Sequence, residues 1–135
     1  MVEAFVGSWD LQRSESFDEY MKNLNVNLMQ RTLAVTVKPK TIISVENDVI
    51  TVTTKSSIKT TKIQFKLAEE FDETTADNRA TKTTVVLKDG KLVQTQKWDG
   101  KETTLVRELK DGKMILTCTM GDAVCTREYA RSKDD

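Results

Sequence analysis

Three residues in the C-terminal part of the chain, Arg107, Arg127 and Tyr129, are suited to hold an anion. A guanidinium group presents a planar fork of N–H donors that matches the two oxygens of a carboxylate. A tyrosine hydroxyl can add one more donor. The chemistry that these three residues predict is therefore recognition of a carboxylate.

The spacing of two turn signals places these residues on one face of a sheet. The dipeptides Asp-Gly at 111–112 and Gly-Asp at 121–122 are typical of two-residue hairpin turns. Counting outward from both turns puts Arg107, Leu116 and Arg127 in one row across three strands. Because neighbouring strands lie about 4.8 Å apart, we expect the two arginine backbones to be about 10 Å apart. Their side chains can converge over that distance, with Tyr129 next on the same face.

In the strands joined by the predicted hairpin turns, the face that carries Arg107 and Arg127 has no other charged residue. Counting back through the turns at 99–100 and 89–90 extends it, and its other predicted members are Leu105, Leu109, Met114, Leu116, Cys118, Cys125, Thr103, Gln94, Gln96, Leu92, Leu87, Val85 and Thr83. Two buried arginines without a counter-ion would be costly. Two interpretations stay open. Either the arginines reach an acid elsewhere or extend to solvent, or they bind a carboxylate whose apolar tail contributes on the order of 10 kcal/mol, at about 0.8 kcal/mol per methylene.

The composition argues against several other classes of function. With 21 basic and 21 acidic residues the formal net charge is zero, which argues against a nucleic-acid partner. Histidine is absent, so the usual general base and the commonest metal ligand are missing, and two cysteines are too few for a four-ligand zinc site. We expect no enzymatic activity, no metal and no cofactor. No segment approaches the roughly 20 apolar residues of a membrane span, so the sequence predicts a soluble intracellular protein.

Short strands are the elements that position the arginines. From about residue 40 onward, alternating runs rich in β-branched residues are separated by two-residue turn signals, the first of them at 47–48. Successive hairpins predict an up-and-down antiparallel meander, and closing it into a barrel would remove the unpaired edges. The length of 135 residues fits a single domain that spans 1–135.

One segment, residues 16–37, is predicted to be helical. Ser16 and Glu19 fit a capping box at the start of a first helix. Asn25 fits the left-handed residue that ends this helix, and Asn27 fits the N-cap of a second helix. We expect this helix-turn-helix to form a lid over one mouth of the barrel.

Several segments resemble the intracellular fatty-acid-binding protein family over essentially the whole chain. They are GSWDL (7–11), FDEYM (17–21), FDETTADNR (71–79), QKWDGKETTLVREL (96–109) and VCTREY (124–129), and the last three resemble the heart, adipocyte, brain and myelin branch most closely. The resemblance implies an all-β fold, a ten-stranded up-and-down antiparallel β-barrel of the lipocalin-like β-clam type with a helix-turn-helix lid.

The resemblance also implies a function and a site. It implies a non-enzymatic intracellular carrier that binds long-chain fatty acids and transports them in the cytosol. Arg127 and Tyr129 would contact the carboxylate directly, and Arg107 would help, often through water. The implied entrance lies near Phe17, Met21, Ile58, Ala76 and Asp77. The register argument adds Gln96, Leu105, Leu116 and Cys118 to the cavity wall.

Two other lipid-binding functions stay open. LNVN (24–27) resembles the cellular retinoic-acid-binding relatives, which use a similar Arg-Arg-Tyr grip, so a retinoid carrier is one alternative. A membrane-associated structural role, as in the markedly basic myelin relative, is the other. We expect a monomer in the cytoplasm, with the nucleus as a further location, and transient membrane contact through the lid.

The two cysteines form a predicted cross-strand pair. Under the same register Cys118 and Cys125 are directly opposite each other and both point inward. We expect free thiols in a reducing cytosol. The resemblance to the epidermal and myelin relatives implies that the pair can close on oxidation.

Overall fold

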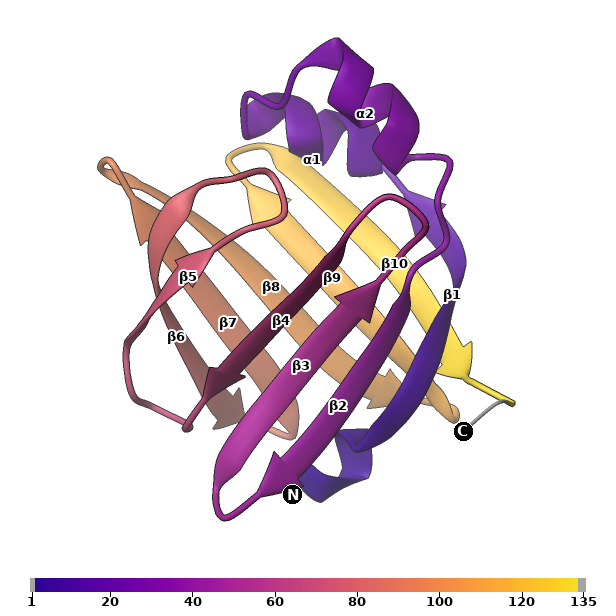
Figure 1. Cartoon of the computed structure of the whole chain (residues 1–135), viewed down its shortest axis with the longest axis vertical. Coiled ribbons are helices and arrows are strands. Elements are labelled where there is room, and N and C mark those ends of the chain that lie inside the picture. Colours follow the sequence, from indigo (N-terminus) through magenta and orange to yellow (C-terminus); the bar gives the residue numbers. More distant parts are fainter. Residues whose placement is uncertain (1, 134–135) are drawn as a thin grey trace.

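The computed structural model describes residues 2–133, which form ten antiparallel strands and two short helices (Figure 1). A 3-10 turn, η1 (Val2–Phe5), precedes β1 (Gly7–Glu15), and α1 (Phe17–Asn23) and α2 (Leu28–Ala34) follow. The other strands are β2 (Lys40–Glu46), β3 (Val49–Lys55), β4 (Thr60–Phe65), β5 (Phe71–Thr74), β6 (Ala80–Lys88), β7 (Lys91–Trp98), β8 (Lys101–Lys110), β9 (Lys113–Met120) and β10 (Ala123–Arg131). The predicted all-β fold with ten strands and a helical lid is confirmed.

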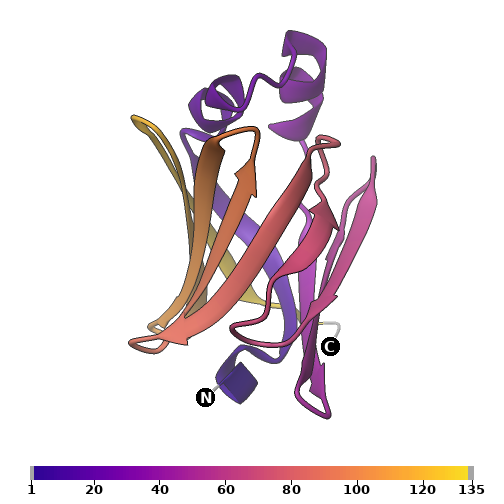
Figure 2. The same ribbon diagram turned by 90° about the vertical axis from the view of Figure 1, so that its left-hand side faces the viewer.

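All ten strands belong to one sheet, in the order β4-β3-β2-β1-β10-β9-β8-β7-β6-β5. Pairing between β1 and β10 curls this sheet into a nearly closed barrel (Figures 1 and 2). The expectation that closure would remove every edge is wrong, because β4 and β5 form no ladder with each other in the described chain.

The gap between β4 and β5 is bridged by side chains. The rings of Phe65 and Phe71 stack across it with their centroids 5.3 Å apart. The connection between the two strands turns at Ala68, which has a φ of 65°. Its backbone N–H donates to the carbonyl of Val85 on β6 at 2.8 Å. This connection is therefore tied to β6 rather than folded back as a hairpin.

The hairpin turns set the register that the sequence predicts. Both residues of the turns at 47–48, 89–90, 99–100 and 111–112 have positive φ, as the type I′ turn requires. Arg107 pairs with Leu116, and Leu116 pairs with Arg127. The predicted row of residues across β8, β9 and β10 is confirmed.

Several of the most deeply buried side chains belong to the end of the barrel away from the helices. Ile50, Leu92 and Met114 each follow a turn at that end by two residues, and none is more than 2% exposed. Trp9 is 1% exposed there. Leu109, which we expected on the buried face, is 37% exposed because it stands at the end of β8 beside the 111–112 turn.

The two helices cover the other end of the barrel (Figures 1 and 2). The predicted capping box at Ser16 is wrong: Ser16 has a φ of 63°, and its side chain makes no capping hydrogen bond. A capping side chain needs an extended backbone at that position, and the left-handed conformation turns it away from the first helical turn. The other two predictions hold, since Asn25 has a φ of 65° and Asn27 Oδ1 accepts from the backbone N–H of Gln30 at 2.9 Å.

The two helices are attached to the barrel unequally. Tyr20 and Met21 of α1 are buried, and the Tyr20 hydroxyl forms a 2.8 Å hydrogen bond with Thr103 Oγ1 on β8. In contrast, α2 buries none of its residues. It is tied to α1 by Arg31, whose Nε donates to Asp18 Oδ1 at 2.9 Å. No helix in residues 2–133 is long and apolar enough to cross a membrane.

Amide hydrogen exchange should be faster in α2 than in α1. Both helices have seven residues, too few for a helix to be stable by itself, so packing decides how often each one opens. Only α1 is anchored by buried side chains, which makes it the matched control for α2. Exchange measured by mass spectrometry with equal or slower rates in α2 would contradict this difference in anchoring.

Candidate binding cavity

A cavity of about 460 Å³ lies between the lid and the inner face of the barrel. Its volume falls within the range of roughly 300–1,000 Å³ that is typical of small-molecule sites. All of the predicted site residues line this cavity, namely Phe17, Met21, Ile58, Ala76, Asp77, Gln96, Leu105, Arg107, Leu116, Cys118, Arg127 and Tyr129. The structure thus brings together residues from α1, from two loops and from four strands.

Arg127 is buried in the wall formed by β10 and has no hydrogen-bond acceptor among residues 2–133. The residue is 5% exposed, and its guanidinium carbon lies 3.9 Å from the centroid of the Phe17 ring, a cation–π contact. Every fully buried side-chain nitrogen or oxygen in the described chain has a hydrogen-bond partner. The Arg127 nitrogens therefore keep surface that faces the hollows lined by this residue, the main cavity and one of about 230 Å³ beside α1.

Tyr129 follows Arg127 on the same face of β10 and is 3% exposed. Its hydroxyl forms no hydrogen bond with the described residues. Arg127 and Tyr129 together therefore offer donors to whatever occupies the cavity, and the protein itself supplies them with no acceptor.

Arg107 differs from Arg127 because it already has a partner. Its Nη1 donates to Gln94 Oε1 at 3.0 Å. The amide nitrogen of Gln94 in turn donates to Glu73 Oε1 at 3.2 Å. Arg107 is thus linked through one amide to a carboxylate on β5. Arg107 therefore reaches an acid only through an amide, whereas the Arg127 donors have no acceptor in the described chain.

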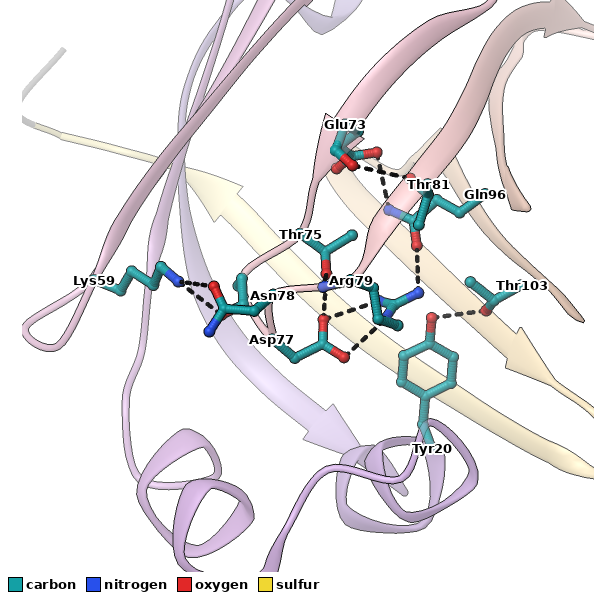
Figure 3. Close-up of polar contacts among 11 residues, drawn as sticks. Tyr20, Lys59, Glu73, Thr75, Asp77, Asn78, Arg79, Thr81, Gln96 and Thr103 are labelled. Carbon is teal, nitrogen blue, oxygen red and sulfur yellow. Dashed lines mark hydrogen bonds and ion pairs between the residues drawn. The ribbon is translucent and has the colours of Figure 1, made fainter. Parts of the chain in front are cut away.

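Glu73 is the centre of a polar network that faces the cavity (Figure 3). Its Oε1 accepts from Thr83 Oγ1 at 2.9 Å, from Gln94 Nε2 at 3.2 Å and from Gln96 Nε2 at 3.0 Å. Gln96 Oε1 accepts from Arg79 Nη1 at 3.2 Å. One carboxylate therefore connects to two arginines, each through a glutamine.

The sequence analysis missed Glu73. The register could be counted back only to Thr83, because a five-residue connection rather than a two-residue turn joins β5 to β6. Alternation within β5 is a signal that could have found it. Glu73 stands two residues after Phe71 and so shares the face of that apolar ring.

The connection from β5 to β6 is held by polar contacts at the mouth of the cavity (Figure 3). Asp77 Oδ2 accepts from Arg79 Nε at 2.7 Å, and its Oδ1 accepts from Thr75 Oγ1 at 2.5 Å. Burial raises the pKa of Asp77, but these two hydrogen bonds and the Arg79 charge outweigh it and leave that pKa below its usual value. The Arg79 guanidinium also lies 4.5 Å from the Trp98 ring.

Two loops of the expected entrance are in contact. Lys59, beside the half-exposed Ile58, donates from Nζ to the carbonyl of Ala76 at 2.9 Å. It also reaches Asn78 Oδ1 at 3.5 Å. The β3–β4 loop and the β5–β6 loop are therefore joined by one lysine across the gap in the sheet.

Cys118 and Cys125 are directly paired across β9 and β10, as the register predicts. Both are buried and neither is bridged. The interaction between the two thiols, together with burial, raises the pKa of the Cys118 thiol well above its usual value. In residues 2–133, no group of three or more His, Cys, Asp or Glu side chains could hold a metal ion.

Comparison with known proteins gives closely similar folds. Residues 6–132 match the lipocalin / cytosolic fatty-acid binding protein family. The fatty acid-binding protein from brain tissue of Drosophila melanogaster is 46% identical over 93% of this chain and 98% of that chain, with a TM-score of 0.88. The Schistosoma mansoni fatty acid binding protein, solved in complex with arachidonic acid, is 36% identical over 98% of both chains, with a TM-score of 0.93. The wild-type fluorescent protein UnaG is 44% identical over 98% of this chain and 100% of that chain, with a TM-score of 0.94.

Replacing Arg127 by leucine should stabilise the empty protein by about 1 to 3 kcal/mol. Exchanging a poorly compensated buried charge for an apolar side chain of similar volume is often stabilising. The gain should appear as a higher free energy of unfolding in urea.

Arg131 on the same strand is the matched control for this substitution. It also lies over an aromatic ring, 4.2 Å from the Trp9 centroid, but it donates to the carbonyls of Val6 and Ala4 at 2.6 and 3.0 Å. Arg131→Leu should therefore lower the free energy of unfolding by about 1 to 2 kcal/mol. An equal loss in Arg127→Leu would show that Arg127 is structurally compensated after all.

Proposed function

The chain belongs to the lipocalin / cytosolic fatty-acid binding protein family, and from that membership we propose that it binds a long-chain fatty acid in its cavity and transports it in the cytosol. The lipid-carrying family and fold support this proposal. So does the Schistosoma mansoni relative, which was solved with arachidonic acid.

The observation that carries the proposal is the buried guanidinium of Arg127, which has no acceptor within the described chain. A fatty-acid carboxylate would accept from Arg127 in a bidentate geometry and from the Tyr129 hydroxyl. Arg107 would add its charge from the same row, two strands away on β8. Its role is secondary, because Gln94 already accepts from one of its nitrogens.

The rest of the cavity suits an acyl chain. One part of its wall is apolar and comes from the lid and from β3, β4, β8 and β9, including Met21, Leu24, Val26, Leu33, Val52, Ile63, Leu105 and Leu116. Each buried methylene contributes about 0.8 kcal/mol. A long chain therefore supplies more than the roughly 8 kcal/mol that micromolar binding requires, before the costs of association are subtracted.

The entrance in this proposal lies between α1 and the two joined loops. Phe17 and Met21 line it from the helix, and Ile58, Ala76 and Asp77 line it from the loops. Lys59 holds the loops together in the structure, so entry would require this contact to open. We propose a monomeric, non-enzymatic carrier in the cytoplasm and the nucleus that uses no cofactor and does not bind nucleic acid.

The outer face of the lid supports transient contact with a membrane. Leu28 is 67% exposed and Met29 77%, both on α2, and neither lines the cavity. Ile58 on the neighbouring loop is 52% exposed. Apolar side chains that gather at one end of a molecule commonly mark an interaction surface, and this end is the one through which the ligand would leave.

Truncating Arg127 to alanine should weaken oleate binding by at least about 30-fold. Removing one partner from a buried charge pair costs about 2 kcal/mol or more, and about 1.4 kcal/mol corresponds to a factor of ten. Arg13→Ala is the matched control, because the Arg13 side chain is 68% exposed and pairs with Glu15 outside the cavity. Isothermal titration that gives equal losses for both variants would exclude Arg127 as the head-group site. Retinoic acid binding more tightly than oleate would favour the retinoid carrier instead.

Replacing Leu28 and Met29 together by serine should slow the transfer of a fluorescent fatty acid to phospholipid vesicles several-fold without changing equilibrium affinity. These side chains lie outside the cavity, so only the encounter with the bilayer should suffer. Leu109→Ser is the control, since Leu109 is an exposed apolar residue at the opposite end of the barrel. Identical transfer rates in both variants would argue for release through the aqueous phase.

A further inference from the structure

The cavity has one polar wall, which a plain hydrocarbon chain would leave unmatched. Glu73, Arg79, Gln94 and Gln96 line it from β5, β7 and the loop before β6. The apolar wall described above lies on the lid and on the other strands. A ligand that complements both walls needs a polar group along its chain in addition to its carboxylate.

Three hydrogen bonds of the polar wall end at one oxygen atom, Glu73 Oε1. Thr83 has a single hydroxyl proton and donates it to Glu73 Oε1, so in the 2.7 Å contact between Thr81 and Thr83 the Thr81 hydroxyl is the donor. The NH₂ groups of Gln94 and Gln96 point at the same oxygen. Their carbonyl oxygens are thereby turned toward Arg107 and Arg79.

The second oxygen of this carboxylate, Glu73 Oε2, accepts no hydrogen bond from residues 2–133. An ionised carboxylate can accept about four hydrogen bonds, and its three protein donors share Oε1. If the methylene groups of a ligand lay against Oε2, this oxygen would be shielded from solvent and would have no hydrogen-bond donor. Such burial of an unsatisfied acceptor costs free energy. A hydroxyl group on the ligand would supply the missing donor.

We propose that the cavity is selective for long-chain carboxylic acids that carry a hydroxyl group on the chain, and that Glu73 recognises this hydroxyl through Oε2. The inference rests on the proposed function, because the carboxylate at Arg127 and Tyr129 anchors the ligand. Glu73 on β5 and Arg127 on β10 belong to one hydrogen-bonded sheet. The hydroxyl therefore has to occupy one region of the chain, and affinity depends on its position.

The first experiment uses the wild-type protein and a ligand series. Titrations compare stearic acid, hydroxystearic acids substituted at successive positions, and the methyl ether of each hydroxy acid. A hydrogen bond to a charged acceptor corresponds to about tenfold or more in affinity. At least one positional isomer should bind about tenfold more tightly than stearic acid, and its methyl ether, which lacks the donor, should lose that gain.

The second experiment replaces the acceptor by Glu73→Gln. The three donors from Thr83, Gln94 and Gln96 hold the amide oxygen of this variant in the place of Oε1, which leaves its NH₂ in the place of Oε2. An NH₂ group donates to a hydroxyl or an ether oxygen alike, so the preference for the hydroxy acid over its ether should fall to near one. Glu70→Gln makes the same chemical change at an exposed position and should keep the wild-type preference.

The outcomes separate this inference from the proposed function. Equal affinities for stearic acid and every hydroxy acid, or an unchanged hydroxyl-to-ether ratio in Glu73→Gln, would overturn the role of Glu73 while leaving fatty-acid binding intact. Weak binding of all the acids, stearic acid included, would instead overturn the proposed function. Should Glu73→Gln fail to fold, the positional series and the ether contrast in the wild type decide the question.

Discussion

The ladder between β1 and β10 is the constraint on which the rest of this structure depends. It curls a ten-stranded sheet on itself, so one face of the strands is turned inward, away from bulk solvent. Any charge on that face must then find a partner inside the shell. The lid and the two loops at the open end complete this enclosure, and the network around Glu73 faces it.

Within that interior the two arginines of the row across β8–β10 have different surroundings. Gln94 accepts from Arg107 and donates to Glu73. The amide thus bridges the guanidinium and the carboxylate, which form no direct ion pair. Gln96 does the same between Arg79 and Glu73. Amides in these places let one acid serve two cations. Arg127, stacked on Phe17, lies outside this arrangement.

The parts of the site that counting along the strands predicted, as distinct from those that the resemblance implied, are governed by short turns. A two-residue hairpin permits one register, so counting from 111–112 and 121–122 was enough to align Arg107 with Arg127 and Cys118 with Cys125. Glu73 was not predicted, because the connection before β6 is not a two-residue turn. Its conformation depends on Asp77, Arg79 and a lysine on another loop. Local pattern does not encode such long-range contacts.

Two further differences between the predicted and the observed structure have the same origin. Ser16 has the right neighbours for a capping box, but the junction between β1 and α1 imposes a left-handed backbone on it. The unpaired edges of β4 and β5 follow from the curvature of the whole sheet, which no single strand specifies. Sequence reasoning was therefore accurate where structure is local and failed where distant elements decide it.

The stacked pair Phe65 and Phe71 gives the barrel an unusual mechanical property. A ladder of backbone hydrogen bonds resists widening because several bonds must break together. Between β4 and β5 the contacts are fewer: two flat rings 5.3 Å apart, which can slide past each other at the cost of dispersion contacts, and the hydrogen bond from Lys59 to Ala76 at the mouth. The shell is therefore stiff around most of its circumference and compliant along one seam. Its interior volume can adjust to occupants of different girth while the register of every ladder, and with it the position of Arg127, stays unchanged.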